Sequence, residues 1–260
     1  MRYRLSVDNI LKEEFTKGDQ ESGMIQKRPG TFVMVDGIAG SGKTTILNAL
    51  KEKLVKEGRV VFDLGDHESD ETPHFQTYQD ADVFLTYEPT RTWIGRAIRY
   101  ELSRTDYPYG GEELAHAFAL DRQILYKRFI IPALQANKIV IQSRGISTSL
   151  VYQPIMENSV HLETVKNLPG NNLALQHVPD ILILANLPAE IAVKRIAERD
   201  DDSKGVFAKL DFLRKLEQRF KEPWFHELFE DKGCTIHHID TNNSLESTIK
   251  QSHKLFESIL

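Results

Sequence analysis

The chain has 260 residues, 40% of them hydrophobic and 27% charged, and its net charge is −5. This composition is typical of a globular protein with a substantial core, and the negative charge disfavours nucleic acid as a partner. No apolar run could cross a bilayer, residues 1–10 lack the apolar segment of a signal peptide, and a single cysteine, Cys234, rules out an internal disulfide. We therefore expect a soluble, cytoplasmic protein that binds neither a membrane nor nucleic acid.

Beyond residue 30 the chain alternates between strand-like and helix-like segments. Residues 1–30 indicate an N-terminal appendage, and residues 31–260 a single domain. Short apolar runs predict strands over residues 31–35, 59–64, 83–87, 139–142, 181–184 and 235–239. Apolar residues at helical spacing predict helices over residues 44–57, 92–102, 112–136, 147–157, 189–199, 211–228 and 244–259.

Three stretches show neither pattern. Residues 65–82 are acidic and polar and indicate a surface loop or insertion, residues 158–179 a loop with a short helix, and residues 199–208 a charged loop. Pro132 is expected to break or kink its helix. The alternation of strands and helices predicts a three-layer α/β/α fold, in which helices cover both faces of a central parallel sheet of about five strands.

The most specific local motif lies at residues 37–44, between the first strand and the first helix. Its sequence, Gly-Ile-Ala-Gly-Ser-Gly-Lys-Thr, fits the P-loop pattern G-x-x-x-x-G-K-[ST], which binds the phosphates of nucleoside triphosphates. Glycines let backbone N–H groups converge on phosphate oxygens, Lys43 can reach the β and γ phosphates, and the Thr44 hydroxyl can ligate Mg²⁺. The expected ATP-binding residues are Gly37, Gly40, Ser41, Gly42, Lys43, Thr44 and Thr45.

Three other classes of nucleotide-binding protein fit less well. A GTPase needs Asn-Lys-x-Asp to select guanine, but the Asn-Lys pair at residues 137–138 is followed by Ile-Val. A motor ATPase normally carries acidic residues at the end of the strand that is followed here by Ser143 and Arg144. The dinucleotide-binding fingerprint has a different glycine spacing and lacks the lysine. The reaction must therefore be inferred from other motifs.

Four further segments follow one another along the chain. They are Tyr-Glu-Pro-Thr-Arg at residues 87–91 with Arg99 behind it, Phe-Ala-Leu-Asp-Arg at 118–122, Ser-Arg-Gly-Ile-Ser-Thr-Ser-Leu-Val-Tyr-Gln at 143–153, and a strand at 181–184 before a helix with Arg195 and Arg199. In this order and at this spacing, the chain resembles the thymidylate kinase family over about residues 31–255.

The resemblance implies that ATP, with Mg²⁺, phosphorylates dTMP to dTDP, and that the protein is a homodimer. Because two phosphorylated substrates must be brought together, cations are needed on both sides. Lys43 would serve the donor, while Arg99 and Arg144 match the family arginines that hold the acceptor phosphate. Arg195 and Arg199 lie next to the charged loop at about residues 199–208, which resembles the family's lid and would exclude water. The catalytic residues implied are Lys43, Arg144, Arg195 and Arg199.

The resemblance also implies a nucleoside site. Phe118 matches the residue that stacks on thymine, and Arg122 the one that hydrogen-bonds the base; their spacing places them on one helix face. Ser149 matches a small polar residue that contacts the base, and Tyr152 the tyrosine that favours deoxyribose. Two carboxylates that match family residues near the acceptor and the metal are Asp36 and Glu88. Taken alone, Phe118 is more often a core residue than a stacking platform, and Arg122 is more often a solvated or salt-bridged helix residue.

The chain also departs from the family pattern. Ser143 stands where the family usually has an aspartate that helps to hold Mg²⁺, and a serine brings no charge. Gly145 removes a side chain near the acceptor, while Ser147 and Ala208 stand where many relatives have carboxylates. Two alternatives to a dTMP kinase therefore stay open. One is a deoxynucleoside kinase with thymidine as acceptor, suggested by Trp93 and Ser143, and the other is a nucleotide-binding protein with weak catalysis.

Overall fold

A parallel sheet forms the centre of the molecule. The computed structural model describes residues 28–103, 109–198 and 209–259. In these residues the sheet has six strands, rather than about five. In spatial order the strands are β2 (Val61–Asp63), β3 (Val83–Tyr87), β4 (Ile139–Ser143), β1 (Thr31–Asp36), β5 (Ile181–Asn186) and β6 (Thr235–Asp240). All neighbouring strands pair in parallel, which confirms the predicted α/β class.

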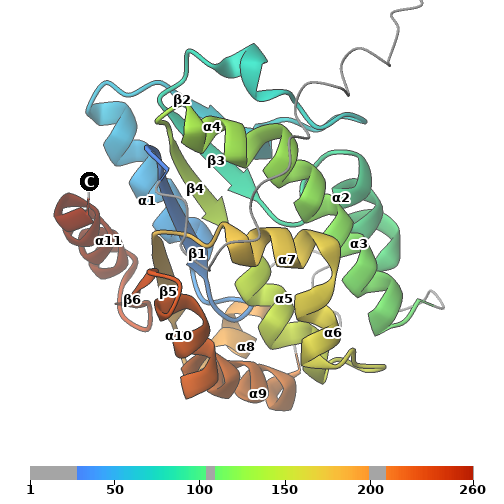
Figure 1. Cartoon of the computed structure of the whole chain (residues 1–260). Helices are drawn as coiled ribbons and strands as arrows, with labels where there is room; N and C mark the ends of the chain where they lie inside the picture. The colour runs from blue at the N-terminus through green and yellow to red at the C-terminus, as the bar shows by residue number, and fades with distance from the viewer. Residues whose placement is uncertain (1–27, 104–108, 199–208, 260) are drawn as a thin grey trace, which may run out of the picture.

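Helices cover both faces of this sheet, as Figure 1 shows. The α-helices of the described residues are α1 (Lys43–Lys56), α2 (Trp93–Ala97), α3 (Gly111–Leu125), α4 (Ile131–Gln135), α5 (Ile146–Tyr152), α6 (Leu162–Asn167), α7 (Pro169–Gln176), α8 (Ala189–Ala197), α9 (Leu210–Lys221), α10 (Pro223–Glu230) and α11 (Leu245–Ile259). Two π-helical turns, Ile98–Leu102 and Tyr126–Ile130, continue α2 and α3. Helices α1 and α11 pack side by side on one face, and α3, α4, α5 and α7 lie on the other.

The four inner strands are mostly apolar because they are buried on both faces. In β1, Val33 and Val35 belong to the core under α1 and α11, which includes Phe256. Their neighbours Phe32 and Met34 point to the opposite core. Strands covered on both sides lose the alternation of apolar and polar residues. Short apolar runs were therefore the correct signal for these strands.

The structure corrects two details of the sequence interpretation and confirms a third. Residues 158–179 contain two helices, α6 and α7. A Cβ at Gly170 would lie 1.7 Å from the Ala119 carbonyl oxygen, so α7 packs tightly on α3. The helix expected over 211–228 is split into α9 and α10, because Glu222 before Pro223 is extended, with ψ at 141°. The predicted irregularity near Pro132 is confirmed as the π-helical turn just before α4.

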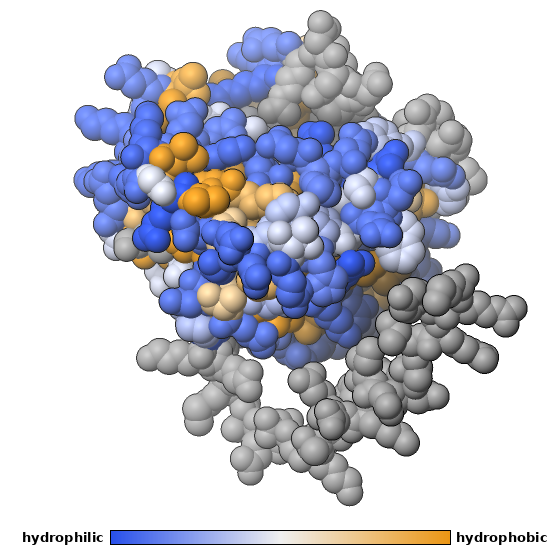
Figure 2. All heavy atoms as spheres, turned by 90° about the horizontal axis from the view of Figure 1, so that it is seen from above, coloured by the Kyte–Doolittle hydropathy of each residue, from blue (hydrophilic) through white to orange (hydrophobic). Residues whose placement is uncertain are grey.

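The surface is mostly hydrophilic on the side shown in Figure 2, where apolar side chains form a patch at the upper left and smaller separate spots elsewhere. Among the described residues, none of the helices is long and apolar enough to span a membrane. The chain starts in the middle of the sheet at β1 and crosses to one edge at β2. It returns through β3 and β4 to the centre, and then adds β5 and β6 on the other side of β1. The crevice beyond the carboxyl ends of such strands is the usual ligand site of an open α/β sheet.

Candidate active site

The loop at residues 37–44 follows β1 at that crevice. Gly40 and Gly42 have φ of +78° and +86°, a left-handed conformation that favours glycine. A Cβ at Gly37 would lie 2.7 Å from the Ala185 carbonyl oxygen on the neighbouring strand. The glycines therefore let the backbone curl tightly over the end of the sheet before α1 begins. Backbone N–H groups at a helix start suit phosphate oxygens.

Lys43 is held against its own loop. Its Nζ donates to the carbonyl oxygens of Gly37 at 2.9 Å and Ile38 at 2.6 Å, and only 7% of the residue is exposed. Thr44 is exposed at the start of α1, whereas Ser41 is buried. The ammonium group is therefore fixed where triphosphate oxygens would approach the loop.

Asp36, expected near the acceptor and the metal, is fully buried. Its carboxylate accepts from the backbone N of Gly37 at 2.7 Å, the Ser147 hydroxyl at 2.5 Å and the Thr148 hydroxyl at 2.7 Å. An aspartate at position 147 would bring two carboxylates together, which is unfavourable. The serine at this position suits the observed contact, and Asp36 ties the phosphate loop to α5.

Glycine at position 145 has a similarly local explanation. A Cβ there would lie 2.6 Å from the Cε of Met34, so a larger residue would displace the Met34 side chain. The preceding Arg144 has φ of +64°, and its backbone N donates to Val35 O at 2.9 Å. This turn directs the chain from β4 into α5 next to the phosphate loop.

Three arginines, Arg91, Arg99 and Arg144, lie close enough to interact electrostatically. Arg99 donates from Nε to Thr90 O at 3.1 Å and from Nη2 to Pro89 O. Partial burial, and then the positive charges of Arg91 and Arg144, lower the pKa of the Arg99 guanidinium. Among the ion pairs of the described residues, none neutralises these arginines with a carboxylate. Such a cluster of unneutralised guanidinium groups suits a phosphate dianion.

Arg122 lies in a buried polar network next to this cluster. Its Nε and Nη2 donate to the two carboxylate oxygens of Glu88 at 3.2 and 2.5 Å, and 1% of Arg122 is exposed. Nη2 also donates to the Ser149 hydroxyl at 2.9 Å, and Nη1 to the Asn171 side chain. Gln142 Nε2 donates to Glu88 Oε1 at 2.8 Å. Burial raises the pKa of Glu88 to about 7, against the opposing charge of Arg122. These bonds leave the guanidinium one N–H on Nη1 for a ligand.

The other residues predicted for the nucleoside lie around this network. Phe118 is half-buried on α3, one turn before Arg122. Tyr152 is 6% exposed on α5, and its ring centroid lies 5.9 Å from the Arg144 guanidinium carbon. Ser149 is on the same helix and also accepts from Gln153 Nε2 at 3.3 Å. The structure thus brings the predicted acceptor residues to one end of the sheet.

The predicted lid is only partly described. Arg195 on α8 donates to Thr241 O at 2.8 Å, just after β6. A Cβ at Gly42 would meet Thr241 at 3.6 Å, and one at Gly40 would meet Ala192 O at 2.9 Å. Helix α8 therefore packs directly on the phosphate loop, and Arg195 lies close to it. Arg199, the lid at about residues 199–208 and nearly all of the N-terminal appendage lie outside the described residues.

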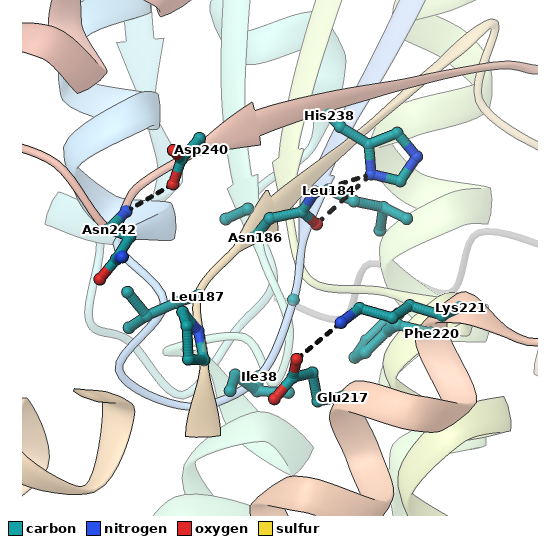
Figure 3. A pocket seen from close by; sticks show the side chains of 13 residues that line it. Ile38, Leu184, Asn186, Leu187, Glu217, Phe220, Lys221, His238, Asp240 and Asn242 are labelled. Carbon is teal, nitrogen blue, oxygen red and sulfur yellow. Dashed lines mark hydrogen bonds and ion pairs between the residues drawn. The ribbon is translucent and has the colours of Figure 1, made fainter. Parts of the chain in front are cut away.

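A cavity adjoins the start of the phosphate loop, as Figure 3 shows. Ile38 forms part of its wall, Asn186 contacts His238 at 3.1 Å across the ends of β5 and β6, and Lys221 donates to Glu217 at 2.6 Å on α9. Among the predicted site residues that the structure describes, only Gly37 lines it. This cavity lies beside the predicted nucleotide site rather than within it.

Comparisons with known proteins agree with this arrangement. The family model described as thymidylate kinase matches residues 73–252. A probable thymidylate kinase of Pyrococcus abyssi is 33% identical over 74% of this chain and 80% of its own length. The chain belongs to the thymidylate kinase family. The thymidylate kinase of Caldicellulosiruptor saccharolyticus is 28% identical over 89% of this chain and 98% of its own, and one of Leptospira interrogans is 31% identical over 76% and 83%.

The match to the thymidylate kinase model starts after the phosphate loop, so the loop motif and the family model are separate observations that agree. Sequence reasoning missed four polar residues around the thymidylate kinase site. These are Arg91, Asp121, Gln142 and Asn171. Asp121 could have been found from the sequence, because it directly precedes Arg122 in the motif at residues 118–122. Asn171 lies in the stretch without clear pattern, and nothing local connects it to α3.

Proposed function

We propose that this protein carries out the reaction of its family through the crevice described above, transferring the γ-phosphoryl group of ATP to dTMP and releasing dTDP. The observation that carries the proposal is the arrangement of cations at the end of β1. Lys43 lies in the phosphate loop, and Arg99 and Arg144 belong to the arginine cluster, for which the described residues show no ion pair with a carboxylate. Phosphoryl transfer depends mainly on positioning and charge neutralisation, which such an arrangement supplies.

We assign the residues to the following roles. The loop from Gly37 to Thr45 binds the triphosphate, with Lys43 neutralising charge on the transferred group. Arg99 and Arg144 hold the acceptor phosphate, and Arg195 with Arg199 closes the donor side. The residues for the nucleoside are Glu88, Phe118, Arg122, Ser149 and Tyr152, with Asp36 as the link between loop and α5. The single N–H left on Arg122 favours a base with a carbonyl at that edge, as in thymine.

The metal would enter with the nucleotide. The described residues contain no cluster of three or more His, Cys, Asp or Glu side chains that could hold an ion. Thr44 offers an exposed hydroxyl, while both oxygens of Asp36 already accept hydrogen bonds. Mg²⁺ commonly relies on few protein ligands together with phosphates and water. The residues therefore fit Mg²⁺ carried by ATP, which would neutralise phosphate charge, with Thr44 as the protein ligand.

Ser143 is expected to limit the use of Mg²⁺. The Ser143→Asp variant should lower the Mg²⁺ concentration needed for half-maximal rate by about tenfold, because a carboxylate adds charge at the end of β4. Ser143→Asn is the matched control, since asparagine has nearly the same size as aspartate but carries no charge. Steady-state rates measured across a Mg²⁺ titration test this prediction. Equal Mg²⁺ dependence in the two variants would contradict it.

The pH dependence of kcat/KM for dTMP should reflect the protonation of Glu88. Because its pKa is raised to about 7, Glu88 is charged above pH 7 and pairs with Arg122, and it is protonated below. We expect kcat/KM for dTMP, divided by the value for the Glu88→Gln variant, to fall as the pH drops through 7. The ionisation of dTMP itself affects both proteins and cancels in the ratio. A ratio that stays constant between pH 5.5 and 8.5 (about the range of ordinary buffers) would refute this role.

The stability of the protein should also depend on the protonation of Glu88. The folded protein holds the Glu88 proton up to about pH 7, whereas the unfolded chain releases it near the ordinary glutamate pKa of 4.5. Glu88 therefore favours the folded state below this window, and its contribution is lost as the pH rises through it. Denaturant unfolding of the wild type and of Glu88→Gln across this range measures the effect.

An ADP-release assay with a panel of acceptors tests the function. We expect turnover with dTMP, slower turnover with dCMP and dUMP, and none with thymidine. Turnover of thymidine but not dTMP would instead support the deoxynucleoside kinase, and tight dTMP binding without turnover would support a binding protein.

We further propose that residues 31–260 are the kinase domain and that the protein acts in the cytoplasm. We also propose that it is a homodimer, which a sedimentation experiment tests.

A further inference from the structure

Residues 65–82, the acidic stretch after β2, reach the loop between β3 and α2, which leads to the π-helical turn that carries Arg99. Ser69 and Thr92 form a parallel β-bridge, and the backbone N of Trp93 donates to Ser69 O at 3.2 Å. Arg96 on α2 pairs with Asp70 at 2.7 Å. This stretch is therefore attached to the loop after β3 by backbone and side-chain contacts.

A chain of three buried threonines continues inward from this attachment. Thr72 Oγ1 lies 3.1 Å from Thr92 Oγ1, which lies 3.1 Å from Thr90 Oγ1. Thr90 donates from Oγ1 to Asp121 Oδ1 at 2.7 Å and from its backbone N to Oδ2 at 2.8 Å. The exposed fraction of each of these side chains is 5% or less.

The carboxylate at the end sets the direction of the hydrogen bonds between the hydroxyl groups. An ionised Asp121 only accepts, and its Oδ1, at 2.7 Å, takes the single hydroxyl proton of Thr90 in preference to Thr92 O at 3.1 Å. Thr90 Oγ1 must then accept from Thr92, and Thr92 must accept from Thr72. Thr72 is thus the first donor of a directed chain that starts in the 65–82 stretch and ends on α3.

The same threonine holds an acceptor arginine. The carbonyl oxygen of Thr90 accepts from Arg99 Nε at 3.1 Å. Thr90 has little freedom, because a Cβ at Gly95 would lie 2.3 Å from that same oxygen. Any shift of Thr90 therefore moves the Arg99 guanidinium. Arg99 and Arg144 are both assigned to the acceptor phosphate, and a displaced Arg99 guanidinium would no longer be aligned with that of Arg144.

We propose that Thr72 is a positioning residue for the acceptor phosphate, acting through Thr92 and Thr90 on Arg99. The 65–82 stretch then serves as a brace for the phosphate site. This inference rests on the proposed acceptor role of Arg99. It predicts an effect on the phosphate of dTMP and none on its nucleoside, since Arg122 and Phe118 lie outside the threonine chain.

Thr72→Val and Thr72→Ser are the matched variants, because valine keeps the shape and serine keeps the donor. We expect Thr72→Val to raise KM for dTMP about tenfold, the effect of one buried hydrogen bond. The KM for ATP and kcat should stay within about twofold, and Thr72→Ser should restore the wild-type KM. Calorimetry should show weaker dTMP binding in Thr72→Val and unchanged thymidine binding.

Two results would overturn the proposal. One is equal weakening of dTMP and thymidine by Thr72→Val, and the other is a Thr72→Ser variant as impaired as Thr72→Val. If Thr72→Val does not fold, Thr92→Val breaks the same chain at its middle and must give the same pattern. Absence of dTMP turnover in the wild type would refute the proposed function, while the calorimetric comparison of dTMP with thymidine still decides the role of Thr72.

Discussion

The Lys43→Met variant is expected to lose about a thousandfold in kcat for phosphoryl transfer, a typical loss for one electrostatic contact to a transition state. Methionine keeps most of the length and the apolar stem but removes the ammonium group. In the structure this group already lies at the loop, held by Gly37 O and Ile38 O. Little reorganisation is needed for it to reach the phosphates, so its loss should affect the rate far more than binding.

Steady-state rates with saturating ATP and dTMP measure this loss. Calorimetric binding of dTMP serves as the control and should be unchanged, because Lys43 is assigned to the donor side. A Lys43→Met variant with kcat within tenfold of the wild type would contradict the assignment. Weakened dTMP binding would show that the variant disturbs the acceptor side as well.

The Arg122→Met variant is expected to lower the free energy of unfolding by about 3–5 kcal/mol at pH 8, the usual cost of leaving a buried charge without its partner. Glu88 would then be a buried carboxylate with only Gln142 as a side-chain donor among the contacts of the described residues. The loss should shrink at pH 6, because Glu88 is then protonated, and removal of the Arg122 charge, which lowers the pKa of Glu88, favours its protonation further.

The double variant Arg122→Met, Glu88→Gln provides the control. Removing both charges should recover most of the stability, because the uncompensated carboxylate is gone. It should not recover dTMP binding, since the N–H that would reach the base is still missing. Chemical denaturation and calorimetry on the four proteins of this cycle separate the two effects. A double variant no more stable than Arg122→Met would contradict the account of the pair.

The phosphate loop and the positions of the strands were accessible from the sequence because they depend on local patterns. Gly40 and Gly42 are needed for backbone conformation, and the apolar runs follow from burial on both sheet faces. The acceptor arginines came only from resemblance, since Arg99 and Arg144 carry no local signal of a phosphate site. The structure adds that they lie near each other.

The remaining features depend on contacts between distant segments. Asn171 meets Arg122 across 49 positions of the chain, and Thr72 meets Thr92 across 20. No periodicity reports such pairs, because a polar residue in a short helix or loop is equally common at the surface. Asp36 and Ser147 illustrate the same limit, since the departure from family pattern at 147 has a reason only once the carboxylate beside it is seen.

A single-turnover experiment with ATP labelled in the γ-phosphoryl group and dTMP tests the central claim most directly. With enzyme in excess over labelled ATP, we predict that the label appears in dTDP and that little appears as inorganic phosphate. Label that is released only as inorganic phosphate, or that stays in ATP while dTMP is bound, would contradict the claim.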